Sequence, residues 1–386
     1  MDGHIDEERA RYFRAQFPTF DRVRYLNSCS LGPLSRASRQ GLEQYAEHWE
    51  TYGAPAWWLE WMPRIEHIKQ LFARLVGASD RSVTIHHSIS SALSTIASCI
   101  DHTHRPKVVV SELDFPTIAY QWLARRDVEV TFARTEDGIT VPISEYERLI
   151  DERTALVATS HVFYATGARQ DVKAIATIAH QKGAVAVVDG YHAAGVIPVD
   201  VKSLQADFYL SGTLKWLCGG PGLAFVYADE EQLADLAPGA TGWFAARDQF
   251  AFDTMDFQRA ESADRLQMGT PSIPTLYSGI PALELILDAG ADSIAHRVAS
   301  LVSRATEGAW SRGFEVTTPN QASQRAGIVM IRAEEPQRAA DYLAQHSVVA
   351  DARLGRVRLS PHFFNTEEDI DVSLAALEEY GGVVAV

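Results

Sequence analysis

Short apolar runs alternate regularly with helical stretches through the middle of this sequence, and this alternation limits the folds that the chain can adopt. The apolar runs are rich in β-branched residues and predict buried strands at 107–111, 128–133, 155–160, 184–189 and 207–211. The intervening stretches predict helices near 91–100, 117–125, 144–150, 171–182 and 192–195. Strands joined by crossover helices form βαβ units. The pattern therefore predicts an α/β fold with a mostly parallel sheet covered on both faces.

The segments before and after this alternating region have other sequence patterns. An amphipathic helix is expected over 4–17, and residues 35–77 read as helical with a break at 53–55. A long helix over 276–312 should lead into strands near 314–318, 327–332 and 356–360. We therefore expect an N-terminal helix at 1–20 that packs with the small domain, a large α/β domain at 21–275 and a small α+β domain at 276–386.

Charge and cysteine content exclude several classes of protein. Thirty-five basic and fifty acidic side chains give a formal net charge of −15, which disfavours nucleic acid and anionic membranes as partners. The three cysteines, Cys29, Cys99 and Cys218, match neither a disulfide framework nor the spacing of zinc ligands. No apolar run approaches the roughly 20 residues of a membrane span, and the first residues lack a signal-peptide core. A reducing cytoplasm is the expected compartment.

Two residues that follow neighbouring strands carry the chemistry. Asp189 ends the run 184–189, and Lys215 follows the next run and precedes Trp216 and a glycine-rich turn. Ligands of open α/β sheets gather at the carboxyl ends of strands, where both side chains should lie. An N-cap role for Asp189 and a solvated surface position for Lys215 are the simpler alternatives. A partly buried lysine has a lowered pKa and can form a Schiff base.

A carboxylate and such a lysine on one rim suggest pyridoxal phosphate, which needs an aldehyde partner, an acid beside its ring nitrogen and an anion site. The stretch Ser88-Ile89-Ser90 precedes a helix whose free N–H groups can bind phosphate, although it also reads as ordinary serine capping. Phe115 could stack on the ring. His192 could cover the ring or orient Asp189, or be a buried structural histidine.

Together these segments resemble the class V aminotransferase signature of fold type I pyridoxal-phosphate enzymes. The resemblance is carried by Asp189-Gly-Tyr-His-Ala-Ala-Gly195 and Ser211-Gly-Thr-Leu-Lys-Trp216. It implies a large domain with a mostly parallel sheet of the seven-stranded type and a smaller C-terminal domain. It also implies that Lys215 binds the cofactor covalently and Asp189 pairs with its pyridine nitrogen. Arg358 matches the arginine that binds the substrate carboxylate, with two parallel hydrogen bonds as its physical basis. Arg356 lies on the same strand face, so the sequence does not choose between the two.

Within this family the chain looks most like kynureninase and its relatives, including isopenicillin N epimerase-like and C–S lyase-like enzymes. The landmarks are a substrate loop at Ser30 and the segments around Tyr164, Thr166, Gly219–Gly222, Trp243 and Thr270. The resemblance implies that Ser30 and Tyr164 contact substrate and Thr166 contacts cofactor. It also implies a homodimer in which Trp243 and Thr270 reach the partner's cofactor. Leu214 stands where kynureninases have a phosphate-binding tyrosine, so Ser211 or Thr213 is expected to supply the hydroxyl.

These observations predict a pyridoxal-phosphate lyase or hydrolase that cleaves a C–S or C–C bond of an α-amino acid. Transamination and epimerisation use the same site and remain alternatives. A non-catalytic binding protein is a remote one, because its mark would be loss of Lys215 or Asp189. Residues 328–358 hold no cysteine, which disfavours a cysteine desulfurase. The substrate side chain stays open.

Overall fold

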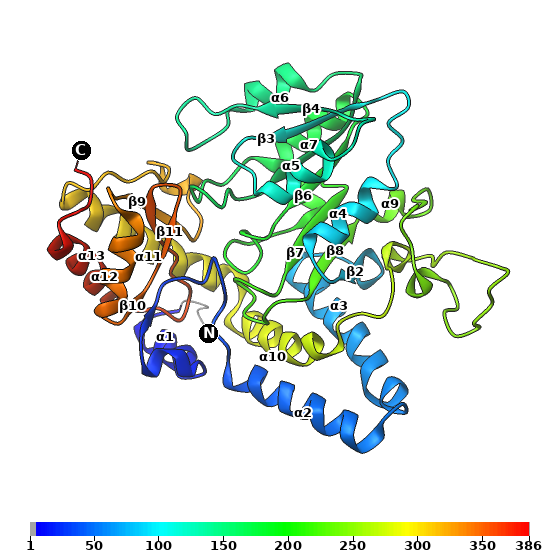
Figure 1. The fold of residues 1–386 in the computed structure, drawn as a ribbon, viewed down its shortest axis with the longest axis horizontal. Coiled ribbons are helices and arrows are strands. Elements are labelled where there is room, and N and C mark those ends of the chain that lie inside the picture. Colours follow the sequence, from blue (N-terminus) through cyan, green and yellow to red (C-terminus); the bar gives the residue numbers. More distant parts are fainter. Residues whose placement is uncertain (1–4, 386) are drawn as a thin grey trace.

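A seven-stranded sheet forms the centre of the large domain in the computed structural model, which describes residues 5–385 (Figure 1). Its strand order is β2-β8-β7-β6-β5-β3-β4, and only β8 runs antiparallel to its neighbours. The strands are β2 Val83–His86, β3 Lys107–Ser111, β4 Glu129–Ala133, β5 Thr154–Ser160, β6 Val185–Asp189, β7 Phe208–Gly212 and β8 Ala224–Ala228. The five predicted strands and the mostly parallel sheet are confirmed.

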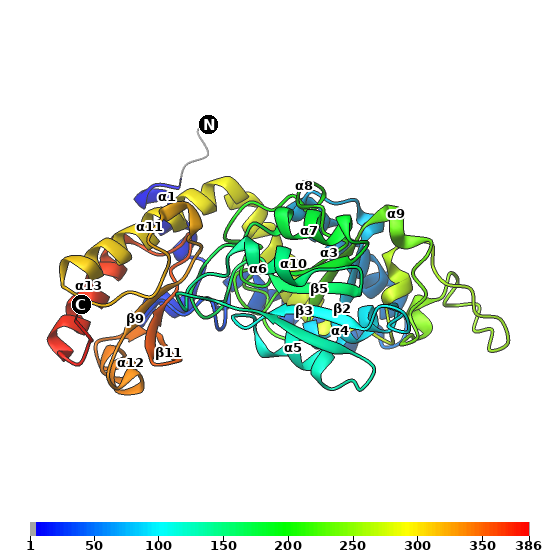
Figure 2. The ribbon, with the colours of Figure 1, turned by 90° about the horizontal axis from the view of Figure 1, so that it is seen from above.

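Helices cover both faces of this sheet, as the view from above shows (Figure 2). Along β3, Val108 and Val110 pack into a cluster with α4 and α5, whereas Val109 faces the cluster beneath α6 and α7. Both faces of the strand are therefore buried, which explains why it reads as a continuous apolar run. The helices of the large domain are α2 Arg36–Tyr52, α3 Met62–Val76, α4 Ile89–Ala97, α5 Pro116–Leu123, α6 Ile143–Leu149, α7 Val172–Gln181, α8 Val201–Leu204, α9 Glu230–Leu233 and α10 Ile273–Ala289.

The smaller domain contains a three-stranded antiparallel sheet, β11-β12-β9, against helices α11 to α13. Its elements are β9 Val329–Arg332, β11 Asp351–Arg353, β12 Arg356–Leu359, α11 Ala291–Ser311, α12 Pro336–Gln345 and α13 Glu367–Tyr380. A two-stranded sheet joins β1 Arg24–Tyr25 to β10 Val348–Val349. The N-terminal helix α1, Glu7–Arg14, packs on this domain: the rings of Phe13 and Phe363 lie 5.1 Å apart, and Arg14 pairs with Asp369 at 2.6 Å.

Three local predictions differ from the structure. The long helix expected over 276–312 is broken at Gly290, whose φ of 85° interrupts α-helical geometry and separates α10 from α11. Because α10 packs on α2 and α3, it belongs with the large domain. Residues 192–195 form turns rather than a helix, and 314–318 makes only isolated bridges, such as Val316 to Ile331.

Two further observations concern the described residues as a whole. None of the helices between residues 5 and 385 is both long and apolar enough to cross a membrane. Cys29, Cys99 and Cys218 are all free thiols.

Candidate active site

A cavity of about 310 Å³ lies beyond the carboxyl ends of β5, β6 and β7. It brings together seven of the residues that the sequence analysis singled out, namely Ser88, Ile89, Ser90, Phe115, Asp189, His192 and Lys215. These residues come from four separate segments, which the parallel sheet places at one edge. The predicted rim site therefore exists as a single cavity.

Asp189 ends β6 and is buried beneath this cavity. Its Oδ1 accepts a hydrogen bond from the backbone N–H of Tyr191 at 2.8 Å. Burial raises the pKa of the Asp189 carboxyl, while the Tyr191 N–H and the charge of Lys215 act in the opposite direction. Among residues 5–385 no cationic side chain lies within ion-pair distance of this carboxylate. A buried carboxylate without a cationic neighbour suits a protonated ring nitrogen as its partner.

Lys215 follows β7 and reaches into the cavity. Burial lowers the pKa of its amine to about 8, and the guanidinium groups of Arg358 and Arg353 add to this effect, while Asp189 opposes it. Its Nζ lies 2.7 Å from Nε2 of His192. A substantial fraction of the amine is therefore neutral near neutral pH, as a nucleophile or general base requires.

The His192 ring is held between Lys215 and Trp216. The indole N–H of Trp216 donates to Nδ1 of His192 at 3.4 Å, so Nδ1 acts as an acceptor. Burial lowers the pKa of His192 well below its usual value, and the charges of Lys215 and Arg358 contribute. A neutral imidazole whose Nδ1 accepts carries its proton on Nε2, which faces the Lys215 amine.

The N-termini of two helices meet at the cavity. Ser88 caps α4 in a reciprocal capping box with Ser91. The next helix, α5, begins at Pro116, and the hydroxyls of Ser90 and Thr117 lie 2.6 Å apart between the two helices. Free backbone N–H groups at two helix starts, flanked by hydroxyls, provide the donors that a phosphate group needs.

Phe115 supplies the aromatic surface. Its ring is half exposed into the cavity and meets the ring of Tyr164 edge to face at 5.2 Å. The preceding residue, Asp114, fixes this loop, because its carboxylate accepts from the backbone N–H groups of Ser111 and Ser160, each at 2.8 Å. Burial raises the pKa of Asp114 to about 7. The loop that carries Phe115 is thereby tied to the end of β5.

The three predicted substrate residues also meet. Arg358 lies on β12 with only 3% of its surface exposed. Its Nη2 donates to the Ser30 hydroxyl at 2.7 Å, and its Nη1 donates to the carbonyl of Tyr164 at 3.3 Å. Arg356 is less buried, and its side chain donates to the carbonyl of Leu354. The structure therefore distinguishes two arginines that the sequence did not.

Five predicted cofactor residues do not line the cavity in their own chain: Thr166, Ser211, Thr213, Trp243 and Thr270. The hydroxyl of Thr166 donates to the carbonyl of Ile139 at 2.9 Å, and that of Thr213 to the carbonyl of Gly220 at 2.7 Å. Both hydroxyls thus hold loops together. The Ser211 hydroxyl is buried without a partner, and Trp243 and Thr270 are exposed at the surface. Cofactor contacts by these five residues stay predictions.

Several lining residues escaped the sequence analysis. His87 precedes Ser88, and Thr117 lies two residues after Phe115. The proline at 116, a residue typical of the first position of a helix, is the sequence signal that could have indicated Thr117. Tyr191 also lines the cavity, and its ring lies 4.7 Å from Nζ of Lys215. Asp351, described below, contacts Arg358 and was not considered at all.

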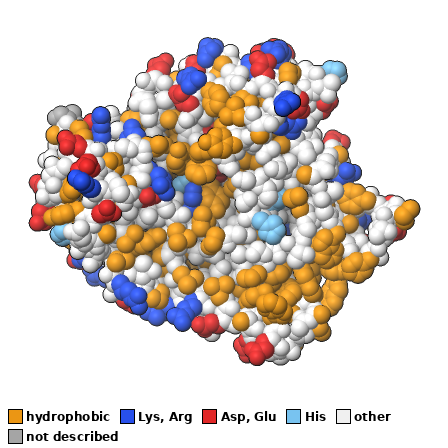
Figure 3. Space-filling model, in the orientation of Figure 1, with side chains coloured by type: hydrophobic (Ala, Val, Ile, Leu, Met, Phe, Trp, Pro, Cys, Tyr) orange, Lys and Arg blue, Asp and Glu red, His pale blue; other side chains and the backbone are white. Residues whose placement is uncertain are grey.

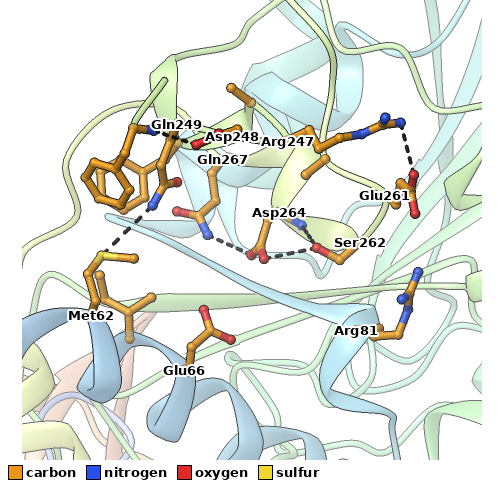
Figure 4. Close-up of a pocket in the computed structure, with 15 residues that line it drawn as sticks. Met62, Glu66, Arg81, Arg247, Asp248, Gln249, Glu261, Ser262, Asp264 and Gln267 are labelled. Atoms are coloured by element: carbon orange, nitrogen blue, oxygen red, sulfur yellow. Dashed lines mark hydrogen bonds and ion pairs between the residues drawn. The ribbon is translucent and has the colours of Figure 1, made fainter. Parts of the chain in front are cut away.

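A second cavity, of about 480 Å³, lies between α3 and the segment 244–267 (Figure 4). Several of its charged groups pair with one another or with neighbouring side chains. Arg247 contacts Glu261 at 3.0 Å, and Asp264 accepts from Lys69 at 2.8 Å and from Gln267 at 2.7 Å. The ion pair between Lys69 and Asp264 fastens the segment to α3.

Comparison with known proteins gives the family. The family model described as aminotransferase class-V matches residues 51–372. An uncharacterized aminotransferase, YcbU, of Bacillus subtilis (strain 168) is 34% identical over 95% of this chain and 96% of its own length. The chain belongs to the class V aminotransferase family. A kynureninase of Bacillus thuringiensis subsp. konkukian (strain 97-27) is 27% identical over 95% of this chain and 90% of its own.

Solved structures agree on the fold. An apo cysteine desulfurase from Thermococcus onnurineus NA1 superposes with a TM-score of 0.86 at 23% identity, covering 96% of this chain and 97% of that one. The cystine C-S lyase C-DES, solved with its product cysteine persulfide, has a TM-score of 0.86 at 19% identity, covering 94% and 99%. The predicted fold type I architecture and class V family are thus confirmed.

The residues present fit the cofactor of this family. Pyridoxal phosphate presents an aldehyde, a basic ring nitrogen and a phosphate. The cavity offers the Lys215 amine, the unpaired Asp189 carboxylate and the starts of α4 and α5. This class V chain is a pyridoxal-phosphate enzyme, as the sequence analysis expected.

Proposed function

We propose that this enzyme is a lyase or hydrolase that cleaves a C–S or C–C bond of an α-amino acid. Pyridoxal phosphate, when bound, supplies an electron-withdrawing ring that stabilises negative charge at the substrate Cα. The observation that carries the proposal is the Lys215 amine, with a pKa lowered to about 8 and with His192 Nε2 at 2.7 Å. This pair can both take a proton and hold one beside the reacting atoms.

The other residues bind and orient. Asp189 would keep the cofactor ring nitrogen protonated, and the starts of α4 and α5 would hold the phosphate. Phe115 would cover one face of the ring. Arg358, buried beside Ser30, would fix the substrate carboxylate. Lys215 would then remove the Cα proton, and the proton it gains can pass to the departing group or return to carbon.

Transamination is the second candidate, and the likeness to YcbU, whose name is that of an aminotransferase, favours it. The similarity to kynureninases and the fold likeness to a cystine C-S lyase favour cleavage instead. Epimerisation would need a proton donor on the opposite face from Lys215. A non-catalytic role is disfavoured, because both Lys215 and Asp189 lie in the cavity.

We further propose that the enzyme acts as a homodimer with shared sites, in which Trp243 and Thr270 reach the partner's cofactor. Both are exposed and lie outside the cavity of their own chain, although the family resemblance assigns them to a cofactor site. Large apolar side chains are also exposed on α2, on the π-helical turn Trp57–Trp61 and on the loop after Trp243. They are Trp49, Trp58, Leu59, Phe252 and Met255. Figure 3 shows apolar side chains gathered on the lower part of one face. A second copy would bury such surface.

Product analysis tests the reaction. The purified holoenzyme is incubated with kynurenine, S-substituted cysteines, their sulfoxides and common amino acids, and small molecules and cofactor are followed by mass spectrometry. Pyruvate or alanine, with the cofactor still as aldehyde, is the expected result. Accumulation of pyridoxamine phosphate with a 2-oxo acid would make the enzyme an aminotransferase. Lys215→Ala should keep the fold and abolish turnover, and an active variant would refute the mechanism.

A further inference from the structure

Arg358, the arginine assigned to the substrate carboxylate, already contacts a carboxylate of the protein itself, that of Asp351. Oδ2 of Asp351 lies 2.6 Å from Nη2 of Arg358 and 2.7 Å from the hydroxyl of Ser30. The same Nη2 donates to Ser30 at 2.7 Å. Burial opposes ionisation of Asp351, but the Ser30 hydroxyl and Arg358 outweigh it and lower the pKa of the carboxyl. Asp351 is therefore an anion at neutral pH.

The fold fixes this pair. The strands β11 and β12 are joined by a two-residue turn, Leu354-Gly355, in which both residues have positive φ, 49° and 79°. Such a turn sets the register of a hairpin, and here it places Asp351 directly opposite Arg358. Oppositely charged residues at directly opposed positions attract each other across the strands. The contact is thus built into the hairpin.

The contact with Asp351 affects how Arg358 can bind a substrate carboxylate, because of the geometry of the guanidinium group. A carboxylate binds a guanidinium at two points either through Nε and Nη2 or through Nη1 and Nη2, so each mode uses a hydrogen of Nη2. Nη2 of Arg358 already donates to two acceptors, Asp351 and Ser30. Nε of Arg358 is buried without a partner. A substrate carboxylate that binds Arg358 at two points must therefore compete with these acceptors for Nη2.

Arg353 is a second cationic partner for the carboxylate of Asp351. Its Nε lies 3.3 Å from the same Oδ2 of Asp351, and half of its side chain is exposed. If Asp351 turns away from Arg358, it keeps a cationic partner on its own strand, and the buried Arg358 gains the substrate carboxylate in exchange. Each arginine then faces one carboxylate, so the exchange leaves no uncompensated buried charge.

We propose that Asp351 holds the place of the substrate carboxylate on Arg358 and turns toward Arg353 when substrate binds. Asp351 is therefore a residue that sets affinity for the carboxylate of the amino acid, because substrate must compete with it. This inference rests on the proposed function in one respect, the assignment of Arg358 to the substrate carboxylate.

The test compares two probes on the holoenzyme: L-alanine, and isopropylamine, which has the same amine and lacks the carboxylate. Binding is read from the initial change in visible absorbance of the bound cofactor. In Asp351→Asn, which keeps size and loses charge, the Kd of L-alanine should fall about tenfold, a change within the range of one charge-assisted hydrogen bond. The Kd of isopropylamine should change less than about twofold. An unchanged or raised Kd for L-alanine, or an equal change for both probes, would overturn the proposal.

Two further variants complete the design. Asp351→Glu keeps the competing charge and should bind L-alanine as wild type does; tightening equal to that of Asp351→Asn would also overturn the proposal. Arg358→Gln should weaken binding of L-alanine and leave isopropylamine unchanged. If Arg358→Gln has no such effect, the assigned arginine in the proposed function is wrong. If it does, and Asp351→Asn fails to tighten binding, only the role of Asp351 is wrong.

Discussion

Removing the cofactor and varying pH should expose Lys215 as an unusually reactive amine. Burial lowers its pKa from the usual 10.5 to about 8. At pH 7 about one amine in ten is then neutral, compared with about three in ten thousand for an ordinary lysine, a difference of roughly 300-fold. Lys215 should therefore add to an aldehyde far below the pH at which a surface lysine does.

The assay treats apoprotein with pyridoxal, traps adducts with borohydride and quantifies modified peptides by mass spectrometry across pH. Modification of Lys215 should have its midpoint near pH 8. Peptides that contain the exposed Lys202 report, in the same samples, on the reaction of the reagent with a surface lysine. Asp189→Asn should move the midpoint of Lys215 lower still, because the Asp189 charge raises the pKa of this amine. A midpoint near 10 in the wild-type protein would refute the argument.

The same shift has a consequence for stability. Between pH 8 and 10.5 the unfolded chain binds more protons at Lys215 than the folded chain does. The contribution of Lys215 to the free energy of unfolding therefore rises with pH across that window. Below pH 8 the buried amine costs up to about 3 kcal/mol. Lys215→Met should therefore stabilise the apoprotein in urea titrations at pH 7, with the gain over wild type vanishing by pH 10.5. If Lys215→Met raises the free energy of unfolding equally at every pH, the gain comes from packing of the methionine side chain and not from loss of a buried charge.

Two further predictions concern a close contact and the assembly. A Cβ at Gly32 would lie 2.1 Å from the carbonyl oxygen of Lys215 and 2.7 Å from Cα of Cys218, so Gly32→Ala should cost about 1–3 kcal/mol and raise KM by displacing the Ser30 loop. Gly239→Ala, whose Cβ would meet nothing closer than 3.7 Å, is the control, and equal effects in urea titrations would contradict the steric reasoning. Met255→Arg should shift the protein toward monomer in sedimentation and reduce turnover, because Met255 is 93% exposed beside the proposed interface. Tyr12→Arg, at a 61% exposed position on α1, should do neither, and a Met255→Arg protein that sediments as wild type would refute this interface.

Local sequence determined the elements that carry Asp189, Lys215 and the start of α4. Each lies within a few residues of the strand or helix that positions it, and apolar runs and serine caps mark those elements directly. The parallel order of strands then puts their carboxyl ends at one edge, so the cavity follows from the pattern without any long-range detail.

The contacts between distant segments near this cavity depend on the tertiary structure. Strand alternation puts Arg356 and Arg358 on one face, but packing buries Arg358 beside Ser30 and leaves Arg356 near the surface. The pairing of Arg358 with Asp351 depends on the register of a hairpin. The contacts of Ser30 with Asp351 and Arg358 join residues more than 300 positions apart. Periodicity carries no information about such contacts, because it reports only on neighbours along the chain. The sequence thus specified the chemical groups near each strand end, and the folded chain selected which of the remaining side chains reach them.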